Sequence, residues 1–298
     1  MRTHALKADL FLLLAATIWG TAFAAQRVGM DSIGPLLFTG LRFLLGALVI
    51  VPLALRAPLT SEERRLGPGR CLSGGLLAGI LLFLGAAIQQ VGLIYTTAAN
   101  AGFITGLYVI MVPLFGLALG QRTGLGTWLG GLLAVTGLYF LSVGESWSIA
   151  YGDALQLLGA VFWAGHVLFL GHWSGRLHPV RLALYQFLTC ATLSLLGALL
   201  SEDIAWHSIQ AAAVPLLYGG LISVGVGFTL QVLGQRDAIP AHAAIILSLE
   251  AVVAALAGWL FLGETLSSRA VFGCALMLGG MLVAQLLPLW RARRLRPA

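Results

Sequence analysis

The chain carries the apolar stretch DLFLLLAATIWGTAFAAQRV at residues 9–28, and the related stretch DALQLLGAVFWAGHVLFLGH begins at residue 153. Asp9 and Trp19 of the first stretch recur as Asp153 and Trp163 of the second, an offset of 144 residues. The register continues, with a one-residue slip in the last three cases, in the pairs Pro35 and Pro179, Arg42 and Gln186, Phe43 and Phe187, Gly120 and Gly263, Gly130 and Gly273, and Gly137 and Gly280. A register kept over half a chain indicates duplication rather than shared composition.

The composition places the chain in a membrane. Of its 298 residues, 59% are hydrophobic and only 9% are charged, whereas soluble domains have about 25% charged residues. The mean hydropathy is +0.95, so a polytopic membrane protein is expected. The net charge of +6 does not indicate nucleic acid as a partner, because the basic residues lie in short loops and at the C-terminus. Three scattered cysteines predict neither a disulfide framework nor a metal site.

The fold class predicted from these patterns is an all-α polytopic membrane protein. A spanning helix needs about 20 mainly apolar residues. Residues 1–25 resemble a cleavable signal peptide, but the recurrence of this segment at 153–174 favours a first helix instead. Ten spans are expected, at residues 9–28, 33–55, 71–94, 98–120, 125–142, 152–174, 179–200, 210–235, 241–262 and 268–289.

The distribution of lysine and arginine predicts the orientation. With the N-terminus in the cytoplasm, 14 of the 17 basic residues fall in cytoplasmic segments, and only Arg27 and Arg269 fall in outer loops. This positive-inside bias places both termini in the cytoplasm and predicts a multi-pass protein of the cell's inner (plasma) membrane.

The repeat has five helices, so the second copy must enter the membrane from the opposite face. The predicted units are residues 1–144, residues 150–290 and a basic cytoplasmic tail at 291–298. Such inverted pairs are typical of secondary transporters, which bind substrate near the midplane between their halves. Small residues spaced four apart, as at Gly75 and Gly79, predict close helix packing and leave open a monomer or a homodimer.

Several motifs resemble EamA-type transporters of the drug/metabolite transporter superfamily. They are ATIWGTAF at 16–23, Arg42-Phe43, NAGFITGLY at 100–108 followed by Val112-Pro113, LEAV at 249–252 and GWLFLGE at 258–264. The resemblance covers essentially the whole chain, although Ala251 stands where the family usually has proline. It implies a ten-helix bundle of two inverted repeats and a central cavity lined mainly by helices 1, 3, 4, 6, 8 and 9. It also implies export or exchange of small metabolites, amino acids or drugs.

Two charges, Arg42 and Glu250, lie near the middle of predicted spans, where a charge costs about 2.5–3.5 kcal/mol on insertion scales. Glu250 is the predicted proton-coupling group, with His166 as a second titratable candidate. Arg42 is interpreted as a structural charge, because its repeat partner is Gln186 and helix 2 is peripheral in the implied fold.

The predicted substrate-binding residues are aromatic or amide side chains that share helix faces. Trp19, Phe23 and Gln26 form one such stripe, and polar atoms within the membrane must face protein or a cavity. Packing is an equally good interpretation of these stripes. The full set is Trp19, Phe23, Gln26, Gln89, Gln90, Asn100, Phe103, Tyr108, Trp163, His166 and Gln231.

The expected function is secondary or facilitated transport of amino acids, amines or drug-like amphipathic solutes by alternating access, with export as the expected direction. The expected partners are that solute, the lipid bilayer and protons. No P-loop, HExxH motif or nucleophile elbow occurs, so neither an enzyme, a cofactor nor a metal is predicted. Three alternatives remain: a nucleotide-sugar or phosphorylated-sugar exchanger, an intramembrane lipid-modifying enzyme, and a non-transporting receptor.

Overall fold

The computed structural model describes residues 2–121, 123–142, 150–265 and 267–294, and no strand occurs in these ranges. Eight described segments are long and apolar enough to cross a membrane, and two shorter apolar stretches, Leu125–Gly137 and Val271–Ala284, accompany them. The chain is therefore an all-helical, multi-span membrane protein. Arg122, residues 143–149 and the end of the predicted tail, 295–298, lie outside the described part.

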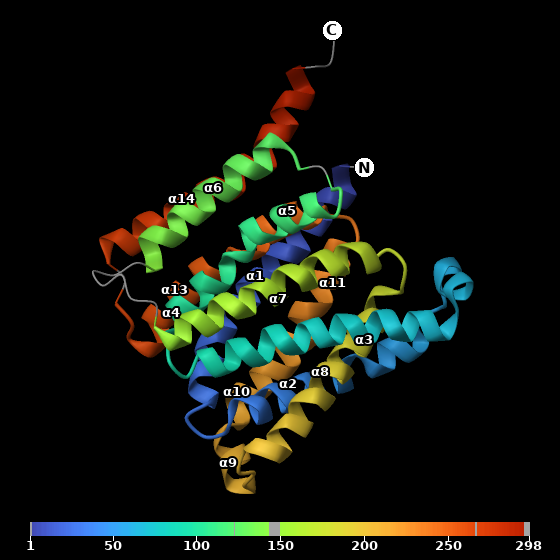
Figure 1. The fold of residues 1–298 in the computed structure, drawn as a ribbon, viewed down its shortest axis with the longest axis vertical. Coiled ribbons are helices and arrows are strands. Elements are labelled where there is room, and N and C mark those ends of the chain that lie inside the picture. The colour runs from blue at the N-terminus through green and yellow to red at the C-terminus, as the bar shows by residue number, and fades with distance from the viewer. Residues whose placement is uncertain (1, 122, 143–149, 266, 295–298) are drawn as a thin grey trace.

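The first half of the chain forms six helical segments (Figure 1). They are α1 (Arg2–Gly29), α2 (Pro35–Arg56), α3 (Ser61–Gly92), α4 (Ala98–Gly106), α5 (Tyr108–Ala118) and α6 (Leu125–Ser142).

The second half forms helices in the same order, with more interruptions. They are α7 (Tyr151–Trp173), α8 (Pro179–Ser201), α9 (Trp206–Ala211), α10 (Ala213–Leu217), the π-helix η1 (Tyr218–Phe228), α11 (Thr229–Gln235), α12 (Pro240–Leu247), α13 (Glu250–Leu262) and α14 (Ser268–Arg294).

Three helices extend beyond the predicted spans. α1 begins at Arg2 rather than residue 9, and α14 continues to Arg294, into the predicted tail. α3 begins ten residues early, at Ser61, because Thr60 and Glu63 form a reciprocal capping box there. The polar first turns of α3 are set off from its apolar part by a kink at Gly67, whose φ of 78° favours glycine.

Two predicted spans are interrupted near their middles. The span at 98–120 is divided into α4 and α5, and the span at 241–262 is divided into α12 and α13. At each break the backbone tightens to i→i+3 hydrogen bonds, from Leu107 N–H to the Ile104 carbonyl and from Leu249 N–H to the Ile246 carbonyl, both at 3.2 Å. The second break therefore forms without proline at position 251.

The two halves pack against each other through equivalent helices. α2 packs on α8 and α6 packs on α14, while α3 packs on α7 much as α1 packs on η1 and α11. Figure 1 shows α6 and α14 side by side on one flank, with α2 and α8 on the opposite side of α1 and α7. The centre of the bundle is therefore enclosed by helices from both halves.

Glycine permits the closest of these approaches. A Cβ atom on Gly130 would lie 2.5 Å from the Gly280 carbonyl oxygen, and one on Gly137 would lie 2.5 Å from that of Gly273. The paired numbers run in opposite directions, so α6 and α14 are antiparallel with their backbones almost in contact. Without water to drive helices together, such close contact is the main source of helix association in lipid.

Carboxylates from one half cap helices of the other half. Glu202, after α8, accepts the first-turn N–H groups of Leu36 at 2.7 Å and Leu37 at 2.8 Å in α2. Glu264, after α13, does the same for the first turn of α4, at 3.0 and 3.3 Å. These contacts satisfy orphan backbone donors and place negative charge at the positive end of the helix dipole.

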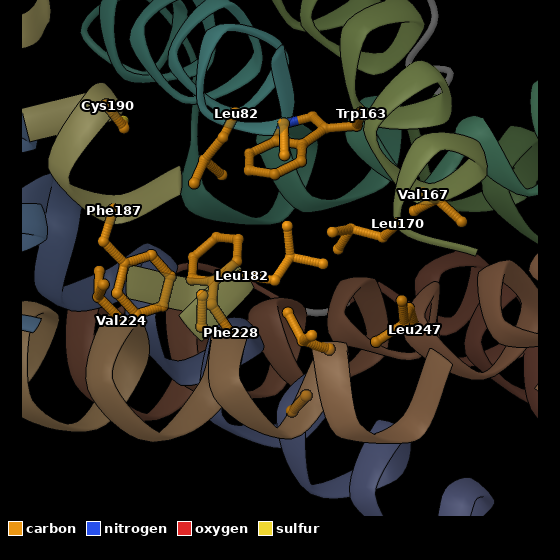
Figure 2. Packing of buried hydrophobic residues seen from close by; sticks show 14 of the residues in the cluster. Leu82, Trp163, Val167, Leu170, Leu182, Phe187, Cys190, Val224, Phe228 and Leu247 are labelled. Atoms are coloured by element: carbon orange, nitrogen blue, oxygen red, sulfur yellow. The ribbon is translucent and has the colours of Figure 1, made fainter. Parts of the chain in front are cut away.

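Phe228, the last residue of η1, is the hub of the main buried cluster. Its ring lies 4.4 Å from that of Trp19, 5.4 Å from Phe43, 5.9 Å from Trp163 and 6.1 Å from Phe187, measured between centroids. Figure 2 shows Phe187, Trp163 and Phe228 converging from three helices. Aromatic pairs of this kind contribute about 0.5–1.5 kcal/mol each beyond area burial, so Phe228 joins η1 to four other helices, α1, α2, α7 and α8.

Candidate functional site

A small cavity lies at the centre of the bundle, beside the Phe228 hub. Its volume is about 30 Å³, enough for one or two water molecules. The walls come from helices of both halves, and the two helix breaks border the cavity. Its lining residues are Trp19, Phe23, Gln26, Arg42, Gln89, Thr105, Tyr108, Trp163, Val167, Ser223, Phe228, Gln231, Leu247 and Glu250.

The helix 1 stripe faces this cavity as a unit: Trp19, Phe23 and Gln26 all line it. The Trp19 indole N–H donates to the backbone carbonyl of Ser223 in η1 at 3.2 Å. Gln26 is 4% exposed, and its Oε1 has no hydrogen-bond donor among the described residues. The stripe therefore presents two rings and one free amide acceptor to the cavity.

Trp163 is the counterpart of Trp19 on α7. Its ring stacks on Phe228 with an interplanar angle of 22°, so Phe228 contacts both repeat-related tryptophans. Sequence reasoning missed Phe228 and Ser223, together with the apolar wall residues Val167 and Leu247. Phe228 is three residues before Gln231 and shares its helix face, which is the signal that could have revealed it.

Glu250 and Tyr108 meet across the cavity from the two helix breaks. The Tyr108 hydroxyl donates to Oε1 of Glu250 at 3.0 Å, and both side chains are buried. Tyr108 is the first residue of α5 and Glu250 is the first residue of α13. This hydrogen bond therefore links the two points at which the membrane helices are interrupted.

A closed ring of hydrogen bonds joins α3, α4 and α7 at one side of the cavity. Gln89 Nε2 donates to Thr105 Oγ1 at 2.8 Å, Thr105 Oγ1 donates to Gln156 Oε1 at 3.4 Å, and Gln156 Nε2 donates to the Gln89 carbonyl at 2.9 Å. Gln89 was predicted from the sequence, whereas Gln156 was not. Gln156 could have been noticed as a lone amide in the apolar helix that starts the second repeat.

The structure places Arg42 at the central cavity, whereas the resemblance implied a peripheral helix 2. Arg42 is 3% exposed and lines the cavity wall, because α2 packs on η1 through the glycine face of that helix. Its guanidinium lies over the rings of Phe38 and Phe43, at 5.8 and 5.2 Å from their centroids. Cation–π contacts contribute about 0.5–2 kcal/mol each, which offsets part of the cost of a charge in the bilayer.

Four predicted binding residues lie away from this cavity. Phe103 packs in the cluster around Ile245, and Asn100 lines a different space at one end of the bundle. Gln90 is fully buried, and neither amide atom has a partner in the described part of the chain. His166 is also fully buried, and its Nε2 lies 2.8 Å from Gln186 Oε1 in α8.

The space that Asn100 lines is an open vestibule of about 680 Å³ at the end where α1 finishes and α4 begins. Arg27, Asp31, Asp153 and Glu264 contribute its charges. Asp153 accepts a hydrogen bond from the Thr96 hydroxyl at 2.8 Å at this end. At the opposite end, His242 Nε2 lies 3.0 Å from Asp9 Oδ1. The cavity is thus small, with a wide vestibule on one side and a cross-linked helix end on the other.

No group of three or more His, Cys, Asp or Glu side chains within the described ranges is arranged to hold a metal ion. The wall chemistry consists of aromatic rings, amides, hydroxyls and one pair of opposite charges. Such a wall suits reversible contact with a small polar or amphipathic molecule.

Comparison with known proteins defines the class. The model of the EamA-like transporter family matches residues 6–143 and again residues 150–285, and the chain belongs to this family. The resemblance inferred from the sequence motifs is thereby confirmed.

Relatives extend over most of the chain. An uncharacterized transporter of Archaeoglobus fulgidus is 33% identical over 293 residues, covering 94% of this chain and 86% of its own length. The uncharacterized inner membrane transporter YedA of Escherichia coli K12 is 30% identical, covering 84% of this chain and 81% of its own. The threonine/homoserine exporter RhtA of Salmonella typhimurium is 29% identical over 156 residues, about half of each chain (50% and 52%).

One solved structure, described as a crystal structure of a protein, has the same fold. It superposes with a TM-score of 0.77 over 97% of this chain and 99% of that chain, at 23% sequence identity.

Proposed function

We propose that this protein is a secondary transporter that exports small amphipathic solutes, such as amino acids or amines, across the inner membrane by alternating access. The observation that carries the proposal is the central cavity, whose aromatic and amide walls come from helices of both halves. A static scaffold gains little from enclosing such a space at the junction of two repeats.

The proposal includes ten spans in two inverted repeats, residues 1–144 and 150–290, with a basic tail and both termini in the cytoplasm. Repeat-related contacts support it, because Trp19 and Trp163 both reach Phe228 from opposite halves. The equivalent residues Asp9 and Asp153 also hydrogen-bond to the beginnings of equivalent spans, at opposite ends of the bundle.

The proposed cycle exchanges the arrangements at the two ends. In this conformation the vestibule at one end has a volume of about 680 Å³, whereas the central cavity has about 30 Å³, which is too small for an amino acid. Solute binding must therefore widen the centre. Because the halves have equivalent folds, rocking one against the other would close the vestibule and open the end at Asp9 and His242.

Amino acids and export are favoured by the name of one relative. RhtA is named as a threonine/homoserine exporter, and it matches about half of this chain. The name YedA, an inner membrane transporter, supports the proposed location. A phosphorylated-sugar exchanger would need several cationic groups at the solute, whereas Arg42 is the one basic residue among those that line the described cavity.

Glu250 is the proposed proton-coupling group. It lines the cavity at a helix break, and its hydrogen bond to Tyr108 connects both breaks. Gain or loss of a proton there would alter a contact that joins the two halves. His166 is a poorer candidate, because it is fully buried against Gln186 and away from the cavity lining.

Counterflow in proteoliposomes tests both the proposed transport of small amphipathic solutes and the proposed proton coupling through Glu250. Vesicles would be loaded with radiolabelled amino acids and small amines, with and without an imposed pH gradient. We expect exchange of at least one compound, with net movement driven by the gradient in the wild type but not in Glu250→Gln. The matched control is Glu62→Gln, which removes an exposed carboxylate that pairs with Arg65.

The outcomes separate cleanly. If the reconstituted wild type exchanges none of the compounds, the proposed solute class is wrong. If exchange occurs but neither the gradient nor Glu250→Gln alters it, transport stands and proton coupling through Glu250 is refuted.

A further inference from the structure

Arg42 is a buried cation that forms no ion pair with any residue in the described part of the chain. Among the described residues, no carboxylate lies within 4.0 Å of its guanidinium. Its Nε is buried and has no hydrogen-bond acceptor in the same part of the chain. The faces of Phe38 and Phe43 are its charge-stabilising contacts. A guanidinium offers five N–H donors in a planar fork that matches a carboxylate, so its position on the cavity wall points to a ligand with that group.

The repeat partner of Arg42 makes a useful contrast. Gln186, 144 residues later, uses its Oε1 in a contact of 2.8 Å with His166 and does not line the cavity. In the second half this position therefore has a protein partner, whereas in the first half it has no hydrogen-bond or ion-pair partner among the residues that the structure describes. A purely structural role would be expected to produce a partner on both sides.

The same cavity carries groups suited to a cation. Glu250 contributes a carboxylate, which one hydroxyl, that of Tyr108, contacts. Gln26 and Gln231 each present a buried Oε1 that has no donor among the described residues. A carboxylate and two amide oxygens are acceptors for an ammonium group, which has three N–H donors and no acceptor. The rings of Trp19 and Trp163 line the space as well.

We infer that the transported solute is a small zwitterion, with its carboxylate bound by Arg42 and its ammonium bound by Glu250 with the amide oxygens of Gln26 and Gln231. The inference rests on the proposed transport function and narrows its solute class. A simple amine would leave the Arg42 charge unpaired. A phosphate dianion would bring two negative charges to one guanidinium in a cavity that also holds Glu250. A zwitterion pairs with both Arg42 and Glu250 and brings no net charge into the cavity.

The test compares acids with their carboxamides in the same vesicles. Counterflow would be measured with threonine, homoserine and the other common amino acids, each against its amide, which keeps the ammonium but loses the carboxylate. The variants are Arg42→Gln, Arg42→Lys and the control Arg65→Gln, which removes an arginine that is 75% exposed, pairs with Glu62 and lines neither the cavity nor the vestibule.

For the wild type we expect an acid to be exchanged at least about tenfold faster than its amide, because truncating one partner of a buried charge pair costs that much or more. Arg42→Gln should slow the acid at least about tenfold and leave the amide within about twofold. Arg42→Lys should exchange the acid at a rate between those of the wild type and Arg42→Gln, because lysine keeps the charge without the planar fork. Arg65→Gln should leave the acid-to-amide ratio unchanged. The acid-to-amide ratio within one preparation does not depend on the amount of folded protein.

Several results would overturn the inference. Equal rates for acid and amide in the wild type would show that the carboxylate is not recognised. Equal slowing of both compounds in Arg42→Gln would assign Arg42 to structure. Exchange of amines or amides alone would refute the zwitterion while leaving transport intact, whereas exchange of no compound would remove the proposed solute class with it.

Discussion

Asp9→Ala is expected to open the end of the bundle at which α1 begins. There, His242 Nε2, near the start of α12, lies 3.0 Å from Asp9 Oδ1, and the two side chains are 24% and 28% exposed. The contact joins α1 to α12 at the end opposite the vestibule. Alternating access requires these helices to separate, so removing the contact should favour the conformation that is open at this end.

The size of the effect follows from the environment of the pair. A hydrogen bond to a charged group contributes about 1.5–3 kcal/mol, whereas a fully exposed ion pair contributes about 1 kcal/mol or less. With about a quarter of each side chain exposed, about 1–2 kcal/mol is expected, between these limits. An energy of this size changes an equilibrium constant about 5- to 30-fold.

Cysteine labelling can measure this change. Leu247, fully buried on the cavity wall, would be replaced by cysteine in a variant whose native Cys71, Cys190 and Cys274 are alanine. A membrane-impermeant maleimide would be added from the side at which α1 begins. Asp9→Ala should raise the labelling rate about 5- to 30-fold. Glu62→Ala, which removes an exposed carboxylate near the same end, should not change the rate.

A double-mutant cycle decides whether the contact itself is responsible. The double variant Asp9→Ala with His242→Ala should label no faster than either single variant, because both remove the same contact. Unchanged labelling in Asp9→Ala, or effects of the two single variants that simply add, would refute the assignment of this pair as a closure of the transport path.

Three further outcomes are expected. Val167→Trp should fill the central cavity and abolish exchange, whereas Val161→Trp, on the more exposed face of the same helix, should not; equal activity in counterflow would contradict the position of the site. Glu202→Gln should destabilise the protein by about 1–3 kcal/mol, because one of its two bonds to α2 becomes neutral and the other is lost to an amide NH2 group that cannot accept, and an unchanged melting temperature in detergent would argue against that cap. Gly130→Val should disrupt the pairing of α6 with α14, since even a Cβ would meet a carbonyl oxygen at 2.5 Å; its thermal stability should fall below that of a matched variant at Gly124, where a Cβ meets nothing within 4 Å.

The positions of the helices were largely predictable because lipid imposes a simple rule on sequence. A span must be long and apolar, and charged or turn-forming residues mark where it ends. The exceptions are instructive. α3 starts early because a local capping box stabilises a polar turn, and η1 departs from α-helical geometry in a glycine-containing segment that packs on α2. A hydropathy pattern predicts neither the early start of α3 nor the π-helical geometry of η1.

The site was only partly predictable from periodicity. Trp19, Phe23 and Gln26 share one helix face and reach the cavity together, as their spacing predicted. His166, Gln90 and Phe103 have the same residue character but are buried outside the cavity lining. Helical periodicity predicts which residues share a helix face. It does not predict which neighbour that face contacts, because the contact depends on the rotation of each helix in the bundle.

The sequence by itself determined that this protein is a duplicated membrane bundle of a transporter family, since apolar length, charge placement and the 144-residue register are properties of the chain alone. The tertiary structure decided which polar groups share one space. Arg42 and Glu250 are 208 residues apart, and the packing of α2 on η1 and of α1 on α13 brings both to a single cavity wall. Local sequence cannot encode that meeting, because it arises from contacts between helices that are distant along the chain.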